Sequence, residues 1–152
     1  MRLAIPTAIL VVVAVLPVVL GTGAAQAQQV IHGCEIKSNT TCPGVDLQGA
    51  YLKGADLDGA VLTGADLSGT SLAGALLTAA DLGNAYMAGA DLSGASLRKA
   101  NLAGADLRDT NLTEANLTGA KLAGARLTGA NIVDAIWIDG RKCGPKSVGD
   151  CR

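Results

Sequence analysis

Large aromatic rings are almost absent from this 152-residue chain, which has no phenylalanine and only 2% aromatic residues. Hydrophobic residues nevertheless make up 49% of the chain, mainly as leucine and alanine. The core of an ordinary globular domain usually relies on phenylalanine, tyrosine and tryptophan. The composition therefore favours a narrow interior that has room only for leucine and alanine.

Histidine is also scarce, and this limits the chemistry that the chain can support. The only histidine is His32, and no nucleophile, base and orienting residue are grouped around it in the sequence. Asp56 and Asp58 are close together, but we expect both to face open water, where pKa tuning is weak. Basic patches with interleaved aromatic residues are missing. We predict no enzyme activity, no cofactor and no nucleic-acid ligand.

The chain contains a five-residue repeat that runs without interruption through residues 45–134. Its unit reads A-(D/N)-L-x-G, and eighteen consecutive copies are centred on positions from Leu47 to Ile132. Met87 replaces leucine once, and a small residue usually lies two positions before each centre. A fixed period of this kind is the signature of a repeat architecture. The predicted core row includes Leu47, Leu52, Leu57, Leu67, Leu92, Leu107 and Leu127.

The period of five fits neither a regular helix nor a regular strand. A helix needs an apolar stripe with a period of 3.6 residues, and a strand alternates with a period of two. Glycine at the last position of the unit, as in Gly49 and Gly54, gives the backbone freedom to turn. The pattern therefore predicts short extended pieces separated by turns, as in the wall of a solenoid.

These repeats resemble the pentapeptide-repeat family, whose unit is A-(D/N)-L-x-x. The resemblance covers about ninety residues. It implies an all-β fold, a right-handed quadrilateral β-helix of about four and a half coils with capped ends. Each coil would hold four pentapeptides, so that residues twenty apart stack and the leucine and alanine positions point inward. Stability would then come from contacts between neighbouring coils.

The first 27 residues have the features of a secretory signal. Arg2 precedes an almost unbroken apolar stretch over residues 3–20, and Ala25-Gln26-Ala27 supplies a small-x-small cleavage pattern. We predict cleavage after Ala27 and a secreted or periplasmic protein. An uncleaved membrane anchor is the alternative, because the apolar stretch is long enough to span a bilayer. The predicted order is a signal peptide in 1–27, an N-terminal cap in 28–44, the β-helix in 45–134, and a C-terminal cap and tail in 135–152.

All four cysteines lie in the predicted end segments, and an even number in an exported chain indicates disulfides. Three pairings are possible in principle, but a rod would hold its two ends farther apart than a disulfide can reach. We predict the bonds Cys34–Cys42 and Cys143–Cys151. A four-cysteine metal site is the alternative, which the same separation disfavours. Trp137 falls at a leucine position but is too large for the interior, so we expect it to close the last coil.

Any function would have to lie on the outward positions. Asp46 and Asp66 would lie one coil apart, close enough to attract a cation or to raise one pKa. Short polar side chains at such positions usually bond to nearby backbone instead, and calcium wants six or more oxygen ligands, so we expect no metal site. The four predicted faces are Asp46, Asp66, Tyr86, Asp106 and Arg126; Tyr51, Ser71, Asp91, Asn111 and Asn131; Asp56, Leu76, Ser96, Asn116 and Ile136; and Val61, Asp81, Asn101 and Lys121.

Charge divides the predicted mature chain into two halves. Residues 28–95 carry seven acids and two bases, whereas residues 96–152 carry six acids and nine bases. This polarity could promote head-to-tail self-association or orient a partner, or it could be an ordinary solvated surface. We predict a non-enzymatic exported scaffold for protein or cell-envelope contacts. The alternatives are a DNA-mimic inhibitor or protector of an enzyme such as gyrase, as the resemblance implies for strongly acidic cytoplasmic members, and recognition of glycan or ice.

Overall fold

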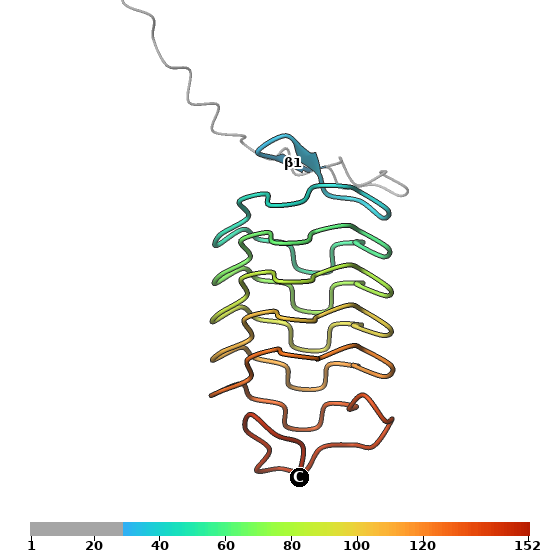
Figure 1. Cartoon of the computed structure of the whole chain (residues 1–152), viewed down its shortest axis with the longest axis vertical. Helices are drawn as coiled ribbons and strands as arrows, with labels where there is room; N and C mark the ends of the chain where they lie inside the picture. The colour runs from blue at the N-terminus through green and yellow to red at the C-terminus, as the bar shows by residue number, and fades with distance from the viewer. Residues whose placement is uncertain (1–28) are drawn as a thin grey trace, which may run out of the picture.

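The computed structural model describes residues 29–152, so the predicted signal peptide lies outside the described part of the chain. Figure 1 shows a stack of similar coils that forms a rod, with the C-terminal tail at one end. At the other end, β1 (Val30–Ile31) and β2 (Cys34–Glu35) pair antiparallel in a short hairpin. Within residues 29–152, no helix is long and apolar enough to cross a membrane.

Parallel β-bridges between residues twenty positions apart hold the coils together. They begin at Thr41–Val61, inside the segment predicted as the first cap, and continue to Asn116–Ile136. The N–H of Leu47 donates to the carbonyl of Asp66 at 2.7 Å, and the N–H of Asp66 donates back to Val45 at 2.9 Å. Repetition of this pair of bonds joins each interior coil to the next. The predicted stacking period of twenty residues is therefore confirmed.

Each five-residue unit ends in a tight turn that contains a left-handed residue. The N–H of Ala50 donates to the carbonyl of Leu47 at 3.0 Å, and Gly49 between them has a φ of 64°. A positive φ at this third position is what a type II turn requires, and glycine adopts it without strain. Ala79 and Lys99 keep a positive φ at the same position, 57° and 58°. The stacked neighbours therefore impose the turn even where the residue does not favour it.

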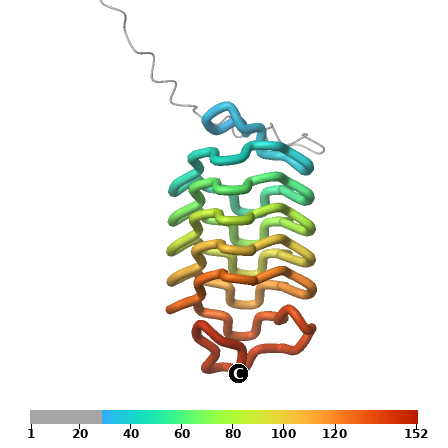
Figure 2. The backbone as a smooth tube through the Cα atoms, viewed as in Figure 1, coloured from blue at the N-terminus to red at the C-terminus, as the bar shows by residue number. Residues whose placement is uncertain are grey.

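A continuous column of leucine and alanine fills the interior. The central row from Leu47 to Leu117 has exposed fractions of 2% or less, and Figure 2 shows the regular stack of coils that surrounds it. Two of the positions where the sequence departs from alanine, Thr70 and Thr110, are buried as well. Their hydroxyls donate to the carbonyls of Leu47, at 2.9 Å, and Leu107, at 2.7 Å. Threonine is thus tolerated because its polar atom bonds to backbone.

The central row is less well covered at the C-terminal end, which corrects one expectation. Leu127 was predicted to lie in the core, but it is only partly buried and packs against the edge of the core. The reason is that the C-terminal tail covers only part of the last coil, where Val148 pairs with Asn131 and Lys142 pairs with Ile136. Beneath the covered part, Ile132 is fully buried and Trp137 is 9% exposed.

Two disulfides tie the ends of the chain. Cys34 bonds to Cys42 with an S–S distance of 2.06 Å, and Cys143 bonds to Cys151 with a distance of 2.03 Å. The described part of the chain has no free cysteine. These are the two pairings predicted from the sequence, one beside the hairpin and one in the C-terminal tail.

Candidate functional site

The outward residues stack into four ladders, which form the surface available to a partner. Each ladder is named after the first residue that the sequence predicted for it. The bridges give an Asp46 ladder (Asp46, Asp66, Tyr86, Asp106, Arg126), a Tyr51 ladder (Tyr51, Ser71, Asp91, Asn111, Asn131), an Asp56 ladder (Asp56, Leu76, Ser96, Asn116, Ile136) and a Val61 ladder (Thr41, Val61, Asp81, Asn101, Lys121). Their membership agrees with the faces predicted from the sequence, with Thr41 added to the last.

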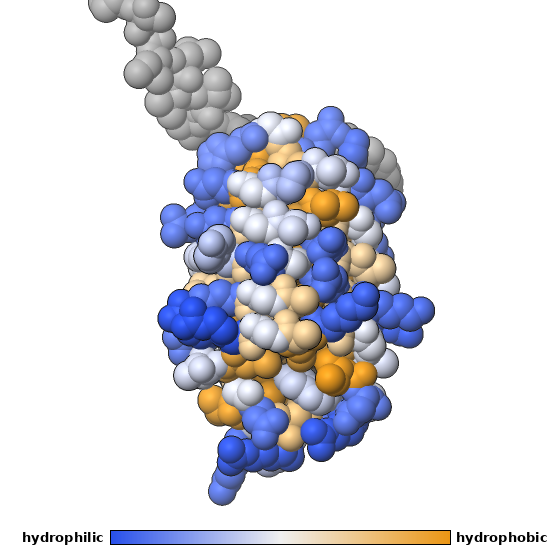
Figure 3. All heavy atoms as spheres, in the orientation of Figure 1, coloured by the Kyte–Doolittle hydropathy of each residue, from blue (hydrophilic) through white to orange (hydrophobic). Residues whose placement is uncertain are grey.

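Exposed apolar side chains are scattered over these ladders. The most exposed are Tyr51 at 69% and Tyr86 at 58%, and they belong to different ladders. On the face drawn in Figure 3, hydrophobic residues form small separate areas between hydrophilic ones. Single exposed apolar residues are normal on a soluble surface, whereas an interaction site usually needs a larger patch. The sides of the rod therefore offer no strong apolar docking area on that face.

The acidic and amide side chains of the ladders are used by the fold. Every aspartate and asparagine at the position before a central residue, from Asp46 to Asn131, accepts the N–H two residues later. Neighbouring coils add side-chain bonds, from Asn101 to Asp81 at 2.9 Å and from Asn111 to Asp91 at 3.0 Å. The backbone bonding expected of these residues is confirmed. No group of three or more metal-binding side chains is formed within residues 29–152.

One ion-pair cluster lies on the Asp46 ladder. Arg108 donates to both carboxylate oxygens of Asp106, at 2.7 and 2.6 Å, and Arg126 lies 3.9 Å from the same carboxylate. The hydrogen bonds from Arg108 lower the pKa of Asp106, and the carboxylate in turn raises the pKa of Arg108. Stacking at twenty residues predicted the neighbour Arg126. It did not predict Arg108, because the side chain of a turn residue can fold in several directions.

The N-terminal end has a shallow open depression of about 240 Å³, lined in part by His32, Cys34, Cys42 and Val45. The Nδ1–H of His32 donates to the carbonyl of Asp46 at 2.6 Å, since a carbonyl can only accept. Both sulfurs belong to the disulfide and therefore carry no thiol. These residues are engaged in holding the hairpin on the first coil.

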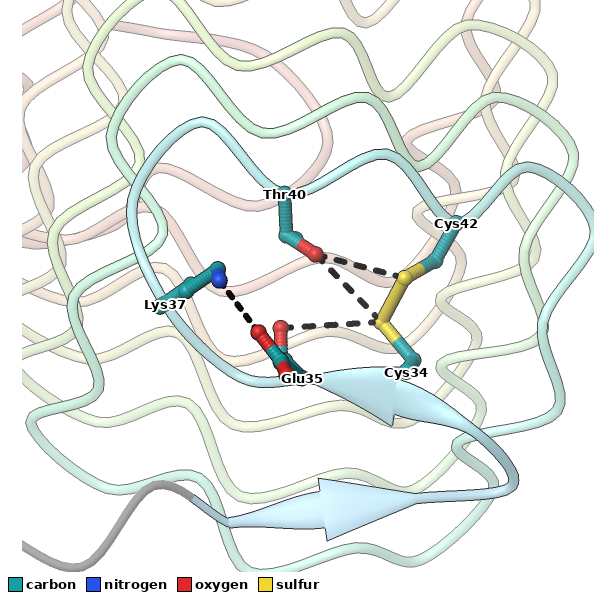
Figure 4. Close-up of polar contacts among 5 residues, drawn as sticks. All are labelled: Cys34, Glu35, Lys37, Thr40 and Cys42. Carbon is teal, nitrogen blue, oxygen red and sulfur yellow. Dashed lines mark hydrogen bonds and ion pairs between the residues drawn. A yellow bond between two sulfur atoms is a disulfide. The ribbon is translucent and has the colours of Figure 1, made fainter.

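A buried threonine supports the same disulfide, as Figure 4 shows. The Thr40 hydroxyl lies 3.4 Å from the sulfur of Cys42 and 3.9 Å from that of Cys34. Thr40 is only 6% exposed, so its hydroxyl needs a partner inside the cap. Lys37 and Glu35 are both exposed and form an ion pair across the same loop. The cap is thus held by a disulfide, a buried hydroxyl and a surface ion pair.

The stacked five-residue units define a β-solenoid, and comparison with known proteins gives its family. A model of pentapeptide repeats matches eight copies over residues 44–78, 75–113 and 110–136, which together make up more than half of the chain. The chain belongs to the pentapeptide-repeat family. No curated protein matches it.

Several solved structures are similar over part of the chain. A pentapeptide repeat protein from Nostoc PCC 7120 is 40% identical, with a TM-score of 0.52, over 53% of this chain and 66% of its own. One from the thylakoid lumen of Arabidopsis thaliana is 35% identical, with a TM-score of 0.35, over 60% and 64%. QnrB1, a plasmid-mediated fluoroquinolone resistance protein, is 17% identical, with a TM-score of 0.28, over 65% and 70%. The chain spans less than two thirds of the length of the first two.

Proposed function

We propose that this protein is a non-enzymatic, extracytoplasmic scaffold that contacts a protein or a component of the cell envelope. The supporting observation is the way its polar side chains are used. The aspartates and asparagines of the ladders bond to their own backbone, and so hold four exposed rows of residues at fixed spacing. A rigid surface of this kind suits binding, because little conformational entropy is lost when a partner docks.

Location outside the cytoplasm is supported by the cysteines and by the predicted signal. Both cysteine pairs are disulfides, and such bonds persist in oxidising compartments. The segment 1–27 has the sequence features of an exported precursor. The proposal also includes a right-handed quadrilateral β-helix of about four and a half coils, which the bridges at twenty-residue spacing support.

The intact mass of the protein, recovered from fractions of its own host, tests this proposal. We expect a chain that starts at Gln28, is lighter by the hydrogens of two disulfides, and occurs outside the cytoplasm. The cytoplasmic fraction of the same cells, treated with a thiol-blocking reagent during lysis, serves as the control for artificial oxidation. Recovery of a full-length, reduced chain from the cytosol would contradict the proposal and restore gyrase-type mimicry as the leading alternative.

The charge of the surface gives no support to DNA mimicry. A DNA mimic needs a continuous acidic surface, whereas the Asp46 ladder ends at Arg126 and the Val61 ladder ends at Lys121. The formal net charge of the chain is only −1. Head-to-tail self-association stays a prediction from the uneven charge, and sedimentation at low and high salt would test it. Identical monomer profiles would exclude it.

A further inference from the structure

Two of the four ladders end without a strand beneath them. The Tyr51 and Asp56 ladders are closed by the tail, through Asn131–Val148 and Ile136–Lys142, whereas the Asp46 and Val61 ladders stop at Arg126 and Lys121. We call residues 120–129 the open edge. No hydrogen bond within residues 29–152 is made by its N–H groups at Leu122, Gly124, Leu127 and Gly129, or by its carbonyls at Ala120 and Ala125.

In the coils above, the equivalent groups are all used. The N–H of Leu102 donates to Lys121 at 2.8 Å, and that of Gly104 donates to Ala123 at 2.9 Å. The open edge therefore has the donors and acceptors of a β-strand that lacks its neighbour. It also has partly buried apolar side chains, Leu122 and Leu127, at positions that are fully buried in the middle coils. A segment that paired with this edge would satisfy the free N–H and carbonyl groups and would cover the exposed apolar side chains.

The tail of the same chain indicates what such a segment looks like. It runs antiparallel to the last coil, and it accepts the N–H of Ile132 at Ser147, 3.1 Å, and the N–H of Trp137 at Arg141, 2.8 Å. The Cys143–Cys151 disulfide closes the tail into a loop over these two ladders. Within residues 29–152 the tail pairs with these two ladders only, and the segment that would pair with the open edge is not among them. Gly149 of the tail lies against one end of the edge, at Leu127 and Gly129.

Charge indicates the chemistry of that segment. Lys121 and Arg126 are the only charged residues of the open edge, and both are exposed. The carboxylate of Asp106 is 3.9 Å from Arg126 but is already bound by Arg108, and the carboxylate of Asp109 lies against Gly129 at the far end of the edge. Two copies that met through this edge would bring four cations together, which disfavours self-pairing. An acidic segment would be attracted by the same cations.

We propose that the open edge binds an acidic segment of a partner protein by antiparallel strand addition, and that this segment bends where the edge itself turns between Leu122 and Ala125. Main-chain hydrogen bonds to Leu122, Gly124 and Leu127 would supply affinity, and acidic side chains beside Lys121 and Arg126 would supply specificity. Small or branched apolar side chains on alternate positions would cover the exposed parts of Leu122 and Leu127. This inference rests on the proposed scaffold function and names the class of its partner.

Binding of model peptides to the oxidised protein, residues 28–152, tests the inference. The probe is a fluorescein-labelled ten-residue peptide in which valine alternates with glutamate, and the matched peptide has lysine in place of glutamate. We expect fluorescence anisotropy to detect only the acidic peptide, with affinity that falls as salt rises. In an amide NMR spectrum, the signals of Leu122, Gly124, Leu127 and Gly129 should shift and gain protection from exchange.

Paired charge-reversal variants separate the open edge from general electrostatics. K121E/R126E should weaken binding of the acidic peptide about tenfold or more. K37E/K53E makes the same change in net charge at exposed residues at the other end of the rod, and it should change affinity less than about twofold. If both pairs weakened binding equally, the open edge would not be the site.

Three results would overturn this inference. They are no binding of the acidic peptide, amide shifts at residues other than those of the open edge, and a dimer in sedimentation that K121E/R126E dissociates. The last would assign the edge to a second copy. None of these results contradicts the scaffold function, which is tested separately by the mass and compartment of the natural protein.

Discussion

Leu92 and Leu127 occupy the same position of the repeat in different coils, and their surroundings differ. Leu92 is fully buried between a coil above and a coil below, whereas Leu127 has a coil on one side only and remains partly exposed. The backbone hydrogen bonds differ in the same way. The N–H of Leu92 donates to the carbonyl of Asn111, whereas the N–H of Leu127 has no partner among residues 29–152. Position in the repeat sets the direction of a side chain, and its neighbours on both sides set its burial.

The largest expected effect comes from placing a charge at these two positions. Leu92→Asp puts a carboxylate in the dry interior, and we expect a loss of about 4 kcal/mol or more in the free energy of unfolding. Leu127→Asp should cost less than half as much, because its carboxylate can reach water at the open edge. Urea unfolding of the oxidised proteins, followed by circular dichroism, measures both. Equal losses would contradict the distinction between the sealed and open parts of the column.

An intermediate effect is expected from removing each disulfide. Both join cysteines eight residues apart, so both restrict the unfolded chain to the same extent, by about 2–3 kcal/mol. The difference between C34S/C42S and C143S/C151S therefore reports on native contacts. We expect the second to cost more, because its loop also covers the edge at Ile132 and Trp137.

Hydrogen exchange by NMR separates the loss of native contacts from the loss of the restriction on the unfolded chain. In C143S/C151S, the amides of Ile132, Asp134 and Trp137 should lose protection, while those of the middle coils keep it. C34S/C42S serves as the matched control and should leave these three amides protected. Unchanged protection in both variants would mean that the tail stays in place without its disulfide.

The sequence was sufficient to predict features that repeat and insufficient for those that occur once. The Leu row, the four ladders and the turns follow from a five-residue period and a twenty-residue coil. Each residue therefore has nearly the same environment as the equivalent residue in the next unit or coil. The partial exposure of Leu127 depends on where the tail crosses the last coil, and no period encodes that path. The sequence gives no direct signal for it, apart from the place where the repeats stop.

The ion-pair cluster is another feature that occurs only once, because it depends on a single arginine side chain. Asp66 and Asp106 are on the same ladder and both bond to the N–H two residues later, but only Asp106 has an arginine two residues later. The side chain of Asp106 is 13% exposed, so the arginine partly replaces water around the carboxylate. A pair at the surface contributes little, and we expect Asp106→Asn to cost at most about 1 kcal/mol.

The pH dependence of that small effect gives the sharpest test. Hydrogen bonds from Arg108 lower the pKa of Asp106 below its ordinary value of 3.8. The resulting stabilisation is complete above the ordinary pKa and is lost as the pH falls through the lower value in the folded protein. The difference in melting temperature between the parent and Asp106→Asn should therefore be constant at neutral pH and disappear in strong acid. Asp66→Asn is the control. Its amide oxygen can still accept the N–H two residues later, and Asp66 has no arginine partner, so this variant should match the parent at neutral pH. A loss that persisted in strong acid would assign the effect to the turn and not to the ion pair.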